Sequence, residues 1–390
     1  MNRDAATGRA RIPRLVRAMR SHASLILAAV VAGVLAWPGT SAARPPGRTG
    51  ARAGSPSAAR AATRALTATR ALGALVFSRG LRSTSVWVAA ADGASARRVA
   101  AGEDPQISAD GRLIAYRSRC HGSSCEQDLM LMPAAGGGRP RTLAHGLQWP
   151  FSFSPDSRTI AAVLGTPGGR ERLVVIDLQT GVQRTIATGC SGCFGGLSFA
   201  PDGGQLVYAL ASSQKTVPYG DLYRVAVAGG APFVVTHDQR ALDPLWGPGG
   251  RIVFARRISG TRATLSQELY LINPEGRHLR RLTYTHINPA IVPLMTGLQP
   301  TAWSASGRRL LAEFTGTDTS YAVTVNVRTG AERTVPGNVV GTALSADGST
   351  ILGEIGGVEG ESLGNVVSVP YNGGLIRVLA RNAGAPDWNR

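Results

Sequence analysis

Residues 194–209 read FGGLSFAPDGGQLVYA, and this stretch has the form of a tight β-hairpin. An apolar run ends at Phe199, residues 200–203 form a turn, and a second apolar run begins at Leu206. Proline presets φ at the first central position of such a turn, aspartate suits the second, and glycine at the fourth tolerates a positive φ. The stretch therefore predicts two antiparallel strands joined by a short bulged turn.

The same hairpin recurs along the chain. Its turn aspartate, or the residue in that place, falls at Asp110, Asp156, Asp202, Gly249, Ser306 and Asp347, at spacings of 46, 46, 47, 57 and 41 residues. A third apolar strand, a turn and a fourth strand follow each hairpin, as in residues 269–283. Repeats of this length made of four short strands are typical of a β-propeller.

The two ends of the chain complete the repeats. Residues 73–79 resemble the second strand of a repeat that lacks a first strand. Residues 386–389 (PDWN) resemble a first strand, PLWG at 244–247, that lacks a second. We therefore expect an all-β fold, a seven-bladed β-propeller over residues 73–390, closed by pairing of the C-terminal strand with the N-terminal blade. Closure of this kind leaves no unpaired inner edge.

The N-terminal residues have a different composition. Arg-rich residues 1–22 precede an apolar run at 23–37, and small residues follow, so residues 1–43 have the pattern of a secretory signal peptide. An uncleaved membrane anchor is the alternative, although the apolar run is shorter than the roughly 17–25 residues that a spanning helix needs. Residues 44–72 are rich in Arg and Ala and predict a disordered linker. The expected location is extracytoplasmic, either secreted or associated with the cell envelope.

The positive charge of the chain lies mostly in these N-terminal residues. The formal net charge is +18, of which residues 1–72, with twelve Arg and one acid, contribute +11. A nucleic-acid partner is therefore not expected, because most of the charge lies outside the folded part. Several arginines of the folded part lie on the predicted outermost strands, where charge discourages pairing between molecules. These arginines are Arg97, Arg98, Arg141, Arg184, Arg280, Arg281, Arg333 and Arg377.

The turn motifs resemble those of a known family. S-A-D-G at 108–111, S-P-D-S-R at 154–158, A-P-D-G at 200–203 and L-Y-L-I-N-P-E-G…R-R-L-T at 269–283 are similar to the WD40-like repeats of the TolB-like propellers. The resemblance covers residues 73–390 and implies a propeller fold and a protein-binding role. The family also includes propellers that gate hydrolases of the prolyl-oligopeptidase type. This chain departs from TolB, which has an additional N-terminal α/β domain and six blades, so the particular partners of TolB are not implied.

The sequence identifies no catalytic residue, metal ligand or cofactor site. No G-x-S-x-G nucleophile motif occurs, which excludes a hydrolase of the prolyl-oligopeptidase type. Acidic residues in loops of one face are candidates for an acid–base pair, but their spacing singles out no pair. These acids are Glu103, Asp104, Glu126, Asp128, Asp221, Asp238, Asp243 and Glu268, and the loop histidines His121, His145, His237 and His286 stand singly. We expect a non-enzymatic binding or scaffold protein, with an enzyme acting on a glycan or lactone through these acids as the alternative.

The four cysteines form two close pairs, Cys120 with Cys125 and Cys190 with Cys193. In an oxidising compartment such pairs form disulfides, and we predict two local bonds. A zinc site built from the four thiols is the alternative. A redox-active C-x-x-C is a third possibility, but no thioredoxin-like context surrounds it.

One loop differs from the other connections between blades. Residues 284–297 read YTHINPAIVPLMTG, and long apolar loops in compact domains are usually functional. The predicted binding residues are Ile287, Ile291, Val292, Leu294 and Met295, with His237 beside them. The alternative is that this loop plugs the central channel as additional core. The expected partner is an envelope or extracellular protein, bound by a monomer that contacts a membrane only through an uncleaved N-terminal segment.

Overall fold

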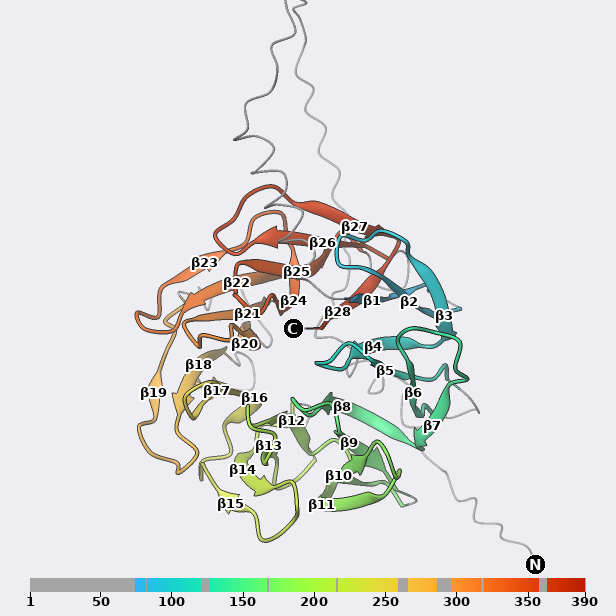
Figure 1. Ribbon diagram of the computed structural model, residues 1–390. Helices are drawn as coiled ribbons and strands as arrows, with labels where there is room; N and C mark the ends of the chain where they lie inside the picture. The colour runs from blue at the N-terminus through green and yellow to red at the C-terminus, as the bar shows by residue number, and fades with distance from the viewer. Residues whose placement is uncertain are drawn as a thin grey trace, which may run out of the picture.

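The computed structural model describes residues 74–81, 83–120, 126–166, 168–214, 217–258, 266–285, 296–316, 319–357 and 363–389. All regular elements in these ranges are β-strands, and their sheets are arranged around a common centre (Figure 1). The predicted signal peptide (1–43) and linker (44–72) lie outside the described residues. Within those same ranges, no helix is long and apolar enough to cross a membrane.

Five of the sheets have four antiparallel strands each. Two of them are β28 (Gly384–Trp388), β1 (Ala74–Arg79), β2 (Ser85–Ala90) and β3 (Arg97–Ala101), and β4 (Glu103–Ile107), β5 (Leu113–Arg117), β6 (Leu129–Pro133) and β7 (Arg141–Ala144). Two more are β8 (Leu147–Phe153), β9 (Thr159–Gly165), β10 (Arg170–Asp177) and β11 (Gln183–Cys190), and β12 (Phe194–Phe199), β13 (Gln205–Leu210), β14 (Asp221–Ala226) and β15 (Phe233–Val234). The fifth is β24 (Val340–Leu344), β25 (Thr350–Ile355), β26 (Asn365–Pro370) and β27 (Arg377–Arg381).

The remaining strands belong to two four-stranded units that touch. The first unit is β16 (Ala241–Gly247), β17 (Arg251–Arg257), β18 (Ser266–Ile272) and β19 (Arg280–Arg281). The second is β20 (Thr296–Trp303), β21 (Arg309–Thr315), β22 (Ser320–Asn326) and β23 (Glu332–Thr334). A short parallel pairing between β18 and β20, which includes Gln267 and Gly297, joins the two units into one eight-stranded sheet.

The first and last described strands share a sheet, in which Leu75 of β1 pairs with Trp388 of β28. The Trp388 side chain is 1% exposed, and its indole N–H donates to the carbonyl oxygen of Leu344 at 3.4 Å. On the opposite side, Oδ2 of Asp387 accepts a hydrogen bond from the backbone N–H of Ile107 at 3.0 Å. β28 therefore contacts the sheets on both of its sides.

Three of the inner hairpin turns contain a hydrogen-bonded pair of a serine and an aspartate. The Ser108 hydroxyl donates to Oδ1 of Asp110 at 2.6 Å and accepts from the backbone N–H of Leu113 at 2.9 Å, while Gly111 adopts a φ of +72°. This hydrogen bond holds the pKa of Asp110 below its ordinary value. The same pair recurs as Ser154 with Asp156 and Ser345 with Asp347. We call the side of the molecule that carries these turns the bottom face, and the side that carries the loops entering the inner strands the top face.

The hydrophobic core lies between neighbouring sheets. One cluster combines Leu129 and Leu131 of β6 with Ile160 of β9 and Val174 and Ile176 of β10, all at most 3% exposed. Each sheet thus buries both faces against its neighbours, as the near-continuous apolar second strands require. The core thus extends from sheet to sheet and supports the loops of both faces.

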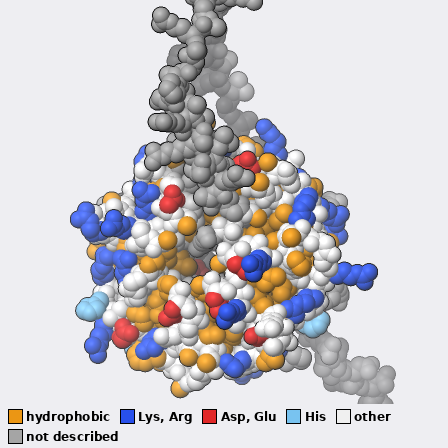
Figure 2. Space-filling view, in the orientation of Figure 1, with side chains coloured by type: hydrophobic (Ala, Val, Ile, Leu, Met, Phe, Trp, Pro, Cys, Tyr) orange, Lys and Arg blue, Asp and Glu red, His pale blue; other side chains and the backbone are white. Residues whose placement is uncertain are grey.

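The outer-strand arginines do more than the predicted protection of strand edges. Four of the eight donate hydrogen bonds to backbone oxygens in the turn of the next sheet, so they also join neighbouring sheets. The pairs are Arg97 Nη2 with Ala134 O (2.9 Å), Arg141 Nη2 with Leu178 O (2.5 Å), Arg184 Nη1 with Val227 O (3.2 Å) and Arg280 Nη2 with Val327 O (3.1 Å). Basic side chains accordingly stand out around the edge of the molecule in Figure 2.

Candidate functional site

The acids at the start of β4 are held by one guanidinium. Nη1 of Arg117 donates to Oδ2 of Asp104 at 3.1 Å, and Nη2 donates to Oε1 of Gln127. The amide nitrogen of Gln127 in turn donates to Oε1 of Glu103 at 2.5 Å. Glu103 and Asp104 are therefore parts of a satisfied polar network at the top face.

Most of the other predicted acids also have partners within the fold. Asp128 pairs with His145 (3.2 Å), Asp221 accepts from the backbone and side-chain nitrogens of Gln239 (2.9 and 2.5 Å), Asp238 pairs with Arg256, and Glu126 makes a contact of its own. His145 is largely exposed, so its carboxylate contact is a surface pair of small energetic value. These residues hold loops in place and do not converge on one point.

Glu268 of β18 is completely buried. Its carboxylate accepts a hydrogen bond from the Thr283 hydroxyl and lies 3.2 Å from Nη2 of Arg281. Burial raises the pKa of Glu268, while the hydrogen bond from Thr283 and the charge of Arg281 oppose that rise. Glu268 thus fixes the start of β18 to the strand that follows.

Asp243 differs from all of these acids because no described residue hydrogen-bonds to its carboxylate. It lies at a bulge of inner strand β16, with a left-handed φ of +47°. The residue is half-buried, and desolvation raises the pKa of its carboxyl to about 7. A carboxyl group with this pKa exchanges its proton near neutral pH, where it can act as donor or acceptor.

The surroundings of Asp243 are apolar and tightly packed. Val217, Tyr219, Leu242 and Ala255 form a buried cluster around the start of β16. On the neighbouring sheet, a Cβ added to Gly196 would lie only 2.7 Å from Cα of Asp243. Glycine at that position lets the backbones of two inner strands approach each other.

Tyr219 links Asp243 to the next polar groups. Its hydroxyl is buried and donates to Oε1 of Gln267 at 2.5 Å, and the guanidinium of Arg257 lies 5.5 Å from the centre of its ring. Burial raises the pKa of Tyr219, and the charge of Asp243 adds to that rise. Asp243, Tyr219, Gln267, Arg257 and Gly196 make up the candidate site, which we call the Asp243 site.

The Asp243 site contains one titratable carboxyl. Glycoside hydrolysis by paired carboxylates needs a second one at about 5–10 Å. No other described carboxylate influences the pKa of Asp243. The arrangement can hydrogen-bond a ligand group and exchange one proton with it.

Sequence reasoning included Asp243 among eight acids but did not distinguish it, and it missed Tyr219, Gln267 and Gly196. The sequence feature that could have drawn attention to Asp243 is the Asp-Pro dipeptide, which occurs at Asp104 and again at Asp243. Only the strand register shows that the two sites differ in their neighbours.

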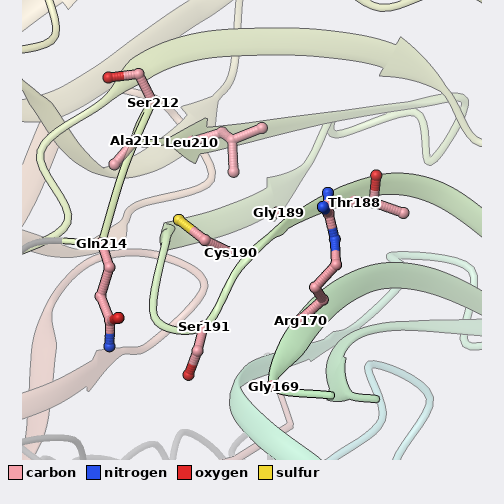
Figure 3. Close-up of a pocket in the computed structure, with 10 residues that line it drawn as sticks. All are labelled: Gly169, Arg170, Thr188, Gly189, Cys190, Ser191, Leu210, Ala211, Ser212 and Gln214. Carbon is pink, nitrogen blue, oxygen red and sulfur yellow. The ribbon is translucent and has the colours of Figure 1, made fainter. Parts of the chain in front are cut away.

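The second feature of the top face is a depression of about 470 Å³ beside the predicted cysteine pair. Cys190 and Cys193 are joined in the predicted disulfide. In Figure 3 the Cys190 sulfur lies between Arg170 and Gln214, and the side chains of Ser191 and Gln214 project in the same direction. The depression is open and polar, suited to hydrogen bonding with a partner's surface.

The other predicted site residues have separate outcomes. Cys120 is also in a disulfide, and Cys125 lies outside the described residues. His237 is exposed on the top face. The predicted binding residues Ile287, Ile291, Val292, Leu294 and Met295, with His121 and His286, lie outside the described residues. In the part of the chain that the structure covers, no three His, Cys, Asp or Glu side chains gather as metal ligands would.

No protein-family profile matches this chain, and a search of curated proteins finds no match. Solved structures do resemble it. TolB from Acinetobacter baumannii is 16% identical, with a TM-score of 0.51 over 79% of each chain. An oligogalacturonate lyase in complex with manganese is 16% identical, with a TM-score of 0.52 over 71% of this chain and 76% of that one.

A puromycin-hydrolyzing peptidase from Mycobacterium tuberculosis is 20% identical, with a TM-score of 0.56. The similarity covers 80% of this chain but only 54% of that peptidase. At these identities the comparisons concern the fold, since the similar proteins include a TolB and two enzymes with different substrates. The chain has the TolB-like β-propeller fold.

Proposed function

We propose that this protein is a non-enzymatic binding or scaffold propeller of the TolB-like class. The observation that carries the proposal is the state of the top-face acids: Glu103, Asp104, Asp221 and Glu268 are each engaged by neighbouring donors of the fold. An active site built from acid pairs would instead present two carboxylates toward one point.

The propeller of this proposal has seven blades, closed by β28. Support comes from the pairing of β28 with β1, from the five four-stranded sheets, and from the two four-stranded units that meet at Gln267 and Gly297. Seven such units arranged around one centre leave each inner strand between two neighbours, which hides the edges that an open array would expose.

The proposed location is outside the cytoplasm. The secretory pattern of residues 1–43 supports it, and so does the disulfide between Cys190 and Cys193, because disulfides persist in oxidising compartments. The proposed partner is therefore an envelope or extracellular protein that docks on the top face of a monomer. The depression beside Cys190 and exposed His237 belong to that face. The apolar sequence of residues 284–297 is proposed as part of the same contact.

The test removes apolar side chains from the proposed contact. The double variant Ile291→Ser/Leu294→Ser should lose cross-linked capture of a defined envelope protein while its melting temperature stays unchanged. The matched control is Leu279→Ser/Leu375→Ser, which changes two exposed leucines in turns of the bottom face and should retain capture. A fall in melting temperature of the first variant alone would identify segment 284–297 as a plug and contradict its role as a contact.

The second candidate function is an enzyme acting on a glycan or lactone, and the raised pKa of Asp243 favours it. A carboxyl with a pKa of about 7 has the proton affinity of a general acid at neutral pH. The purified protein is assayed with glycan and lactone panels, together with Asp243→Asn and Asp104→Asn. Turnover that disappears only in Asp243→Asn would favour the enzyme over the binding protein.

A further inference from the structure

A second depression, of about 450 Å³, lies on the bottom face between the β16–β19 and β20–β23 units. Four arginines contribute to its lining: Arg251, Arg280, Arg308 and Arg328. The other lining residues are Ser306, Gly307 and Val327, so no carboxylate belongs to the pocket. Among the described residues, none of the four guanidiniums forms an ion pair within 4.0 Å. We call this feature the arginine pocket.

Two of the four guanidiniums are fixed by the backbone. Nε of Arg251 donates to the Pro248 oxygen at 3.2 Å, and Nη2 donates to the Gly307 oxygen at 3.0 Å. Nη2 of Arg280 donates to the Val327 oxygen at 3.1 Å. These contacts use neutral acceptors, so the positive charges remain uncompensated while their positions are set before any ligand arrives.

The indole of Trp303 further supports Arg251. The Arg251 guanidinium lies 5.5 Å from the centre of the Trp303 ring, and the indole N–H is held by the Leu245 oxygen at 3.1 Å. A guanidinium stacked on an aromatic ring keeps its donor edge available for a ligand. Arg308 and Arg328 are exposed at the rim, where their side chains can close over a ligand.

The absence of negative charge from the pocket has a specific cause in the repeat. Other inner hairpins carry an aspartate in the turn, at Asp110, Asp156, Asp202 and Asp347. The two hairpins beside the arginine pocket carry Gly249 and Ser306 at this position instead. The turn at Ser306 keeps its local geometry, because the Ser304 hydroxyl lies 3.2 Å from the Ser306 hydroxyl. This contact corresponds to the hydrogen bond from Ser108 to Asp110 in the second repeat. The two turns that lack the aspartate therefore lie beside the pocket that four arginines line.

We propose that the arginine pocket binds a ligand that carries two or more clustered phosphate groups. A guanidinium presents paired N–H donors that match phosphate oxygens, and four of them around one cavity favour multiple negative charge. Either a soluble diphosphate or a phosphodiester polymer supplies this chemistry. The site lies on the face opposite the Asp243 site and does not depend on the proposed protein partner.

Isothermal titration of the full chain with pyrophosphate, orthophosphate and poly(glycerol phosphate) tests the proposal at low and high salt. Pyrophosphate or the polymer should bind at least tenfold more tightly than orthophosphate, and binding should weaken as salt screens the charges. Tighter binding of poly(glycerol phosphate) would identify a phosphodiester polymer as the ligand. Equal or tighter binding of pyrophosphate would identify a soluble diphosphate as the ligand. Absence of binding by both up to millimolar concentration would overturn the proposal.

Two variants locate the binding. Arg308→Ser/Arg328→Ser removes two exposed guanidiniums and should weaken binding at least tenfold. Ser306→Asp restores the aspartate that this turn has elsewhere in the repeat, so the fold should persist while binding weakens several-fold.

The matched control is Arg112→Ser/Arg158→Ser, which removes the same charge from hairpin turns of the same face that retain Asp110 and Asp156. Its affinity should stay within twofold of the unchanged protein. Equal weakening in the control would show that binding reflects net charge alone, and the pocket would then not be the site.

Discussion

Asp104 and Asp243 occupy equivalent positions in two inner strands, but of the two only Asp104 forms an ion pair with an arginine, Arg117. Each precedes a proline, each lies at a strand bulge, and their φ angles are +50° and +47°. Arg117 pairs in the strand register with Glu103, the residue before Asp104. The residue before Asp243 is Leu242, and it pairs with Ala255, which has no charge. One aspartate is therefore ion-paired, whereas the other faces an apolar cluster and has a raised pKa.

This difference predicts a pH-dependent stability. The carboxyl of Asp243 has a pKa of about 7 in the folded protein against 3.8 in the reference state, so its ionisation opposes folding increasingly between pH 4 and 7. Asp243→Asn should leave stability nearly unchanged at pH 4 and raise it by about 1–2 kcal/mol at pH 8, a value reduced for partial exposure. Urea denaturation at both pH values measures this.

Asp104→Asn is the control for that experiment. It removes the partner of Arg117 and should lower stability at pH 8, because the mostly buried guanidinium loses its charge partner. A gain in stability for Asp104→Asn, or an equal effect of Asp243→Asn at both pH values, would contradict the assignment of the raised pKa to Asp243.

The C-terminal strand should be essential for stability. Trp388→Ala empties a site that is 1% exposed between two sheets and should cost about 3–5 kcal/mol. Deletion of residues 384–390 removes the whole strand and should cause aggregation or a clearly lower melting temperature. Thermal unfolding followed by circular dichroism measures both, with Leu375→Ala at an 82% exposed position as the control. A deletion variant that melts like the full chain would disprove closure by β28.

The outer arginines should contribute individually. Arg97→Ala loses two hydrogen bonds, to the oxygens of Ala134 and Ala135 at 2.9 and 2.8 Å, and should destabilise the protein by about 1–2 kcal/mol. Its neighbour Arg98 is exposed on the same strand, and Arg98→Ala should change stability by less than about 0.5 kcal/mol. Equal losses in the two variants would show that general charge, and not the contact with the next sheet, determines the effect.

Both cysteine pairs should be oxidised when the protein is produced in an oxidising compartment. Mass spectrometry of unreduced peptides should find Cys190 bonded to Cys193 and Cys120 to Cys125. Since each bond closes a short loop, replacing one pair by serine should cost at most about 2–3 kcal/mol. Free thiols together with stoichiometric zinc would contradict this assignment and restore the zinc alternative.

The sequence predicted those features that each repeat contains within itself. The hairpin read at residues 194–209 corresponds to β12 and β13, and the PDWN segment lies at β28, because strand alternation and turn chemistry act over a few residues. The site could not be predicted in the same way. The isolation of Asp243 depends on the register that places Ala255 opposite Leu242 and on Tyr219, a residue that belongs to the preceding repeat.

The contacts of the outer-strand arginines with the next sheet could not be predicted either, for a related reason. An arginine such as Arg141 looks in the sequence like a solvated edge residue, and only the spacing of the sheets brings it to the oxygen of Leu178. Contacts between repeats are set by how the sheets pack, which no single repeat encodes.

The acceptors of outer-strand arginines such as Arg141 and Arg184 are backbone oxygens, and this has a consequence for how such a propeller changes during evolution. A side-chain acceptor would have to be matched to each new neighbour, whereas every repeat presents a turn carbonyl whatever its sequence, as Leu178 and Val227 do. A duplicated repeat that carries its own outer arginine would thus meet a backbone acceptor wherever it packs against its neighbour as Arg141 and Arg184 do. The number of repeats can therefore change by gene duplication without a compensating substitution at the seam.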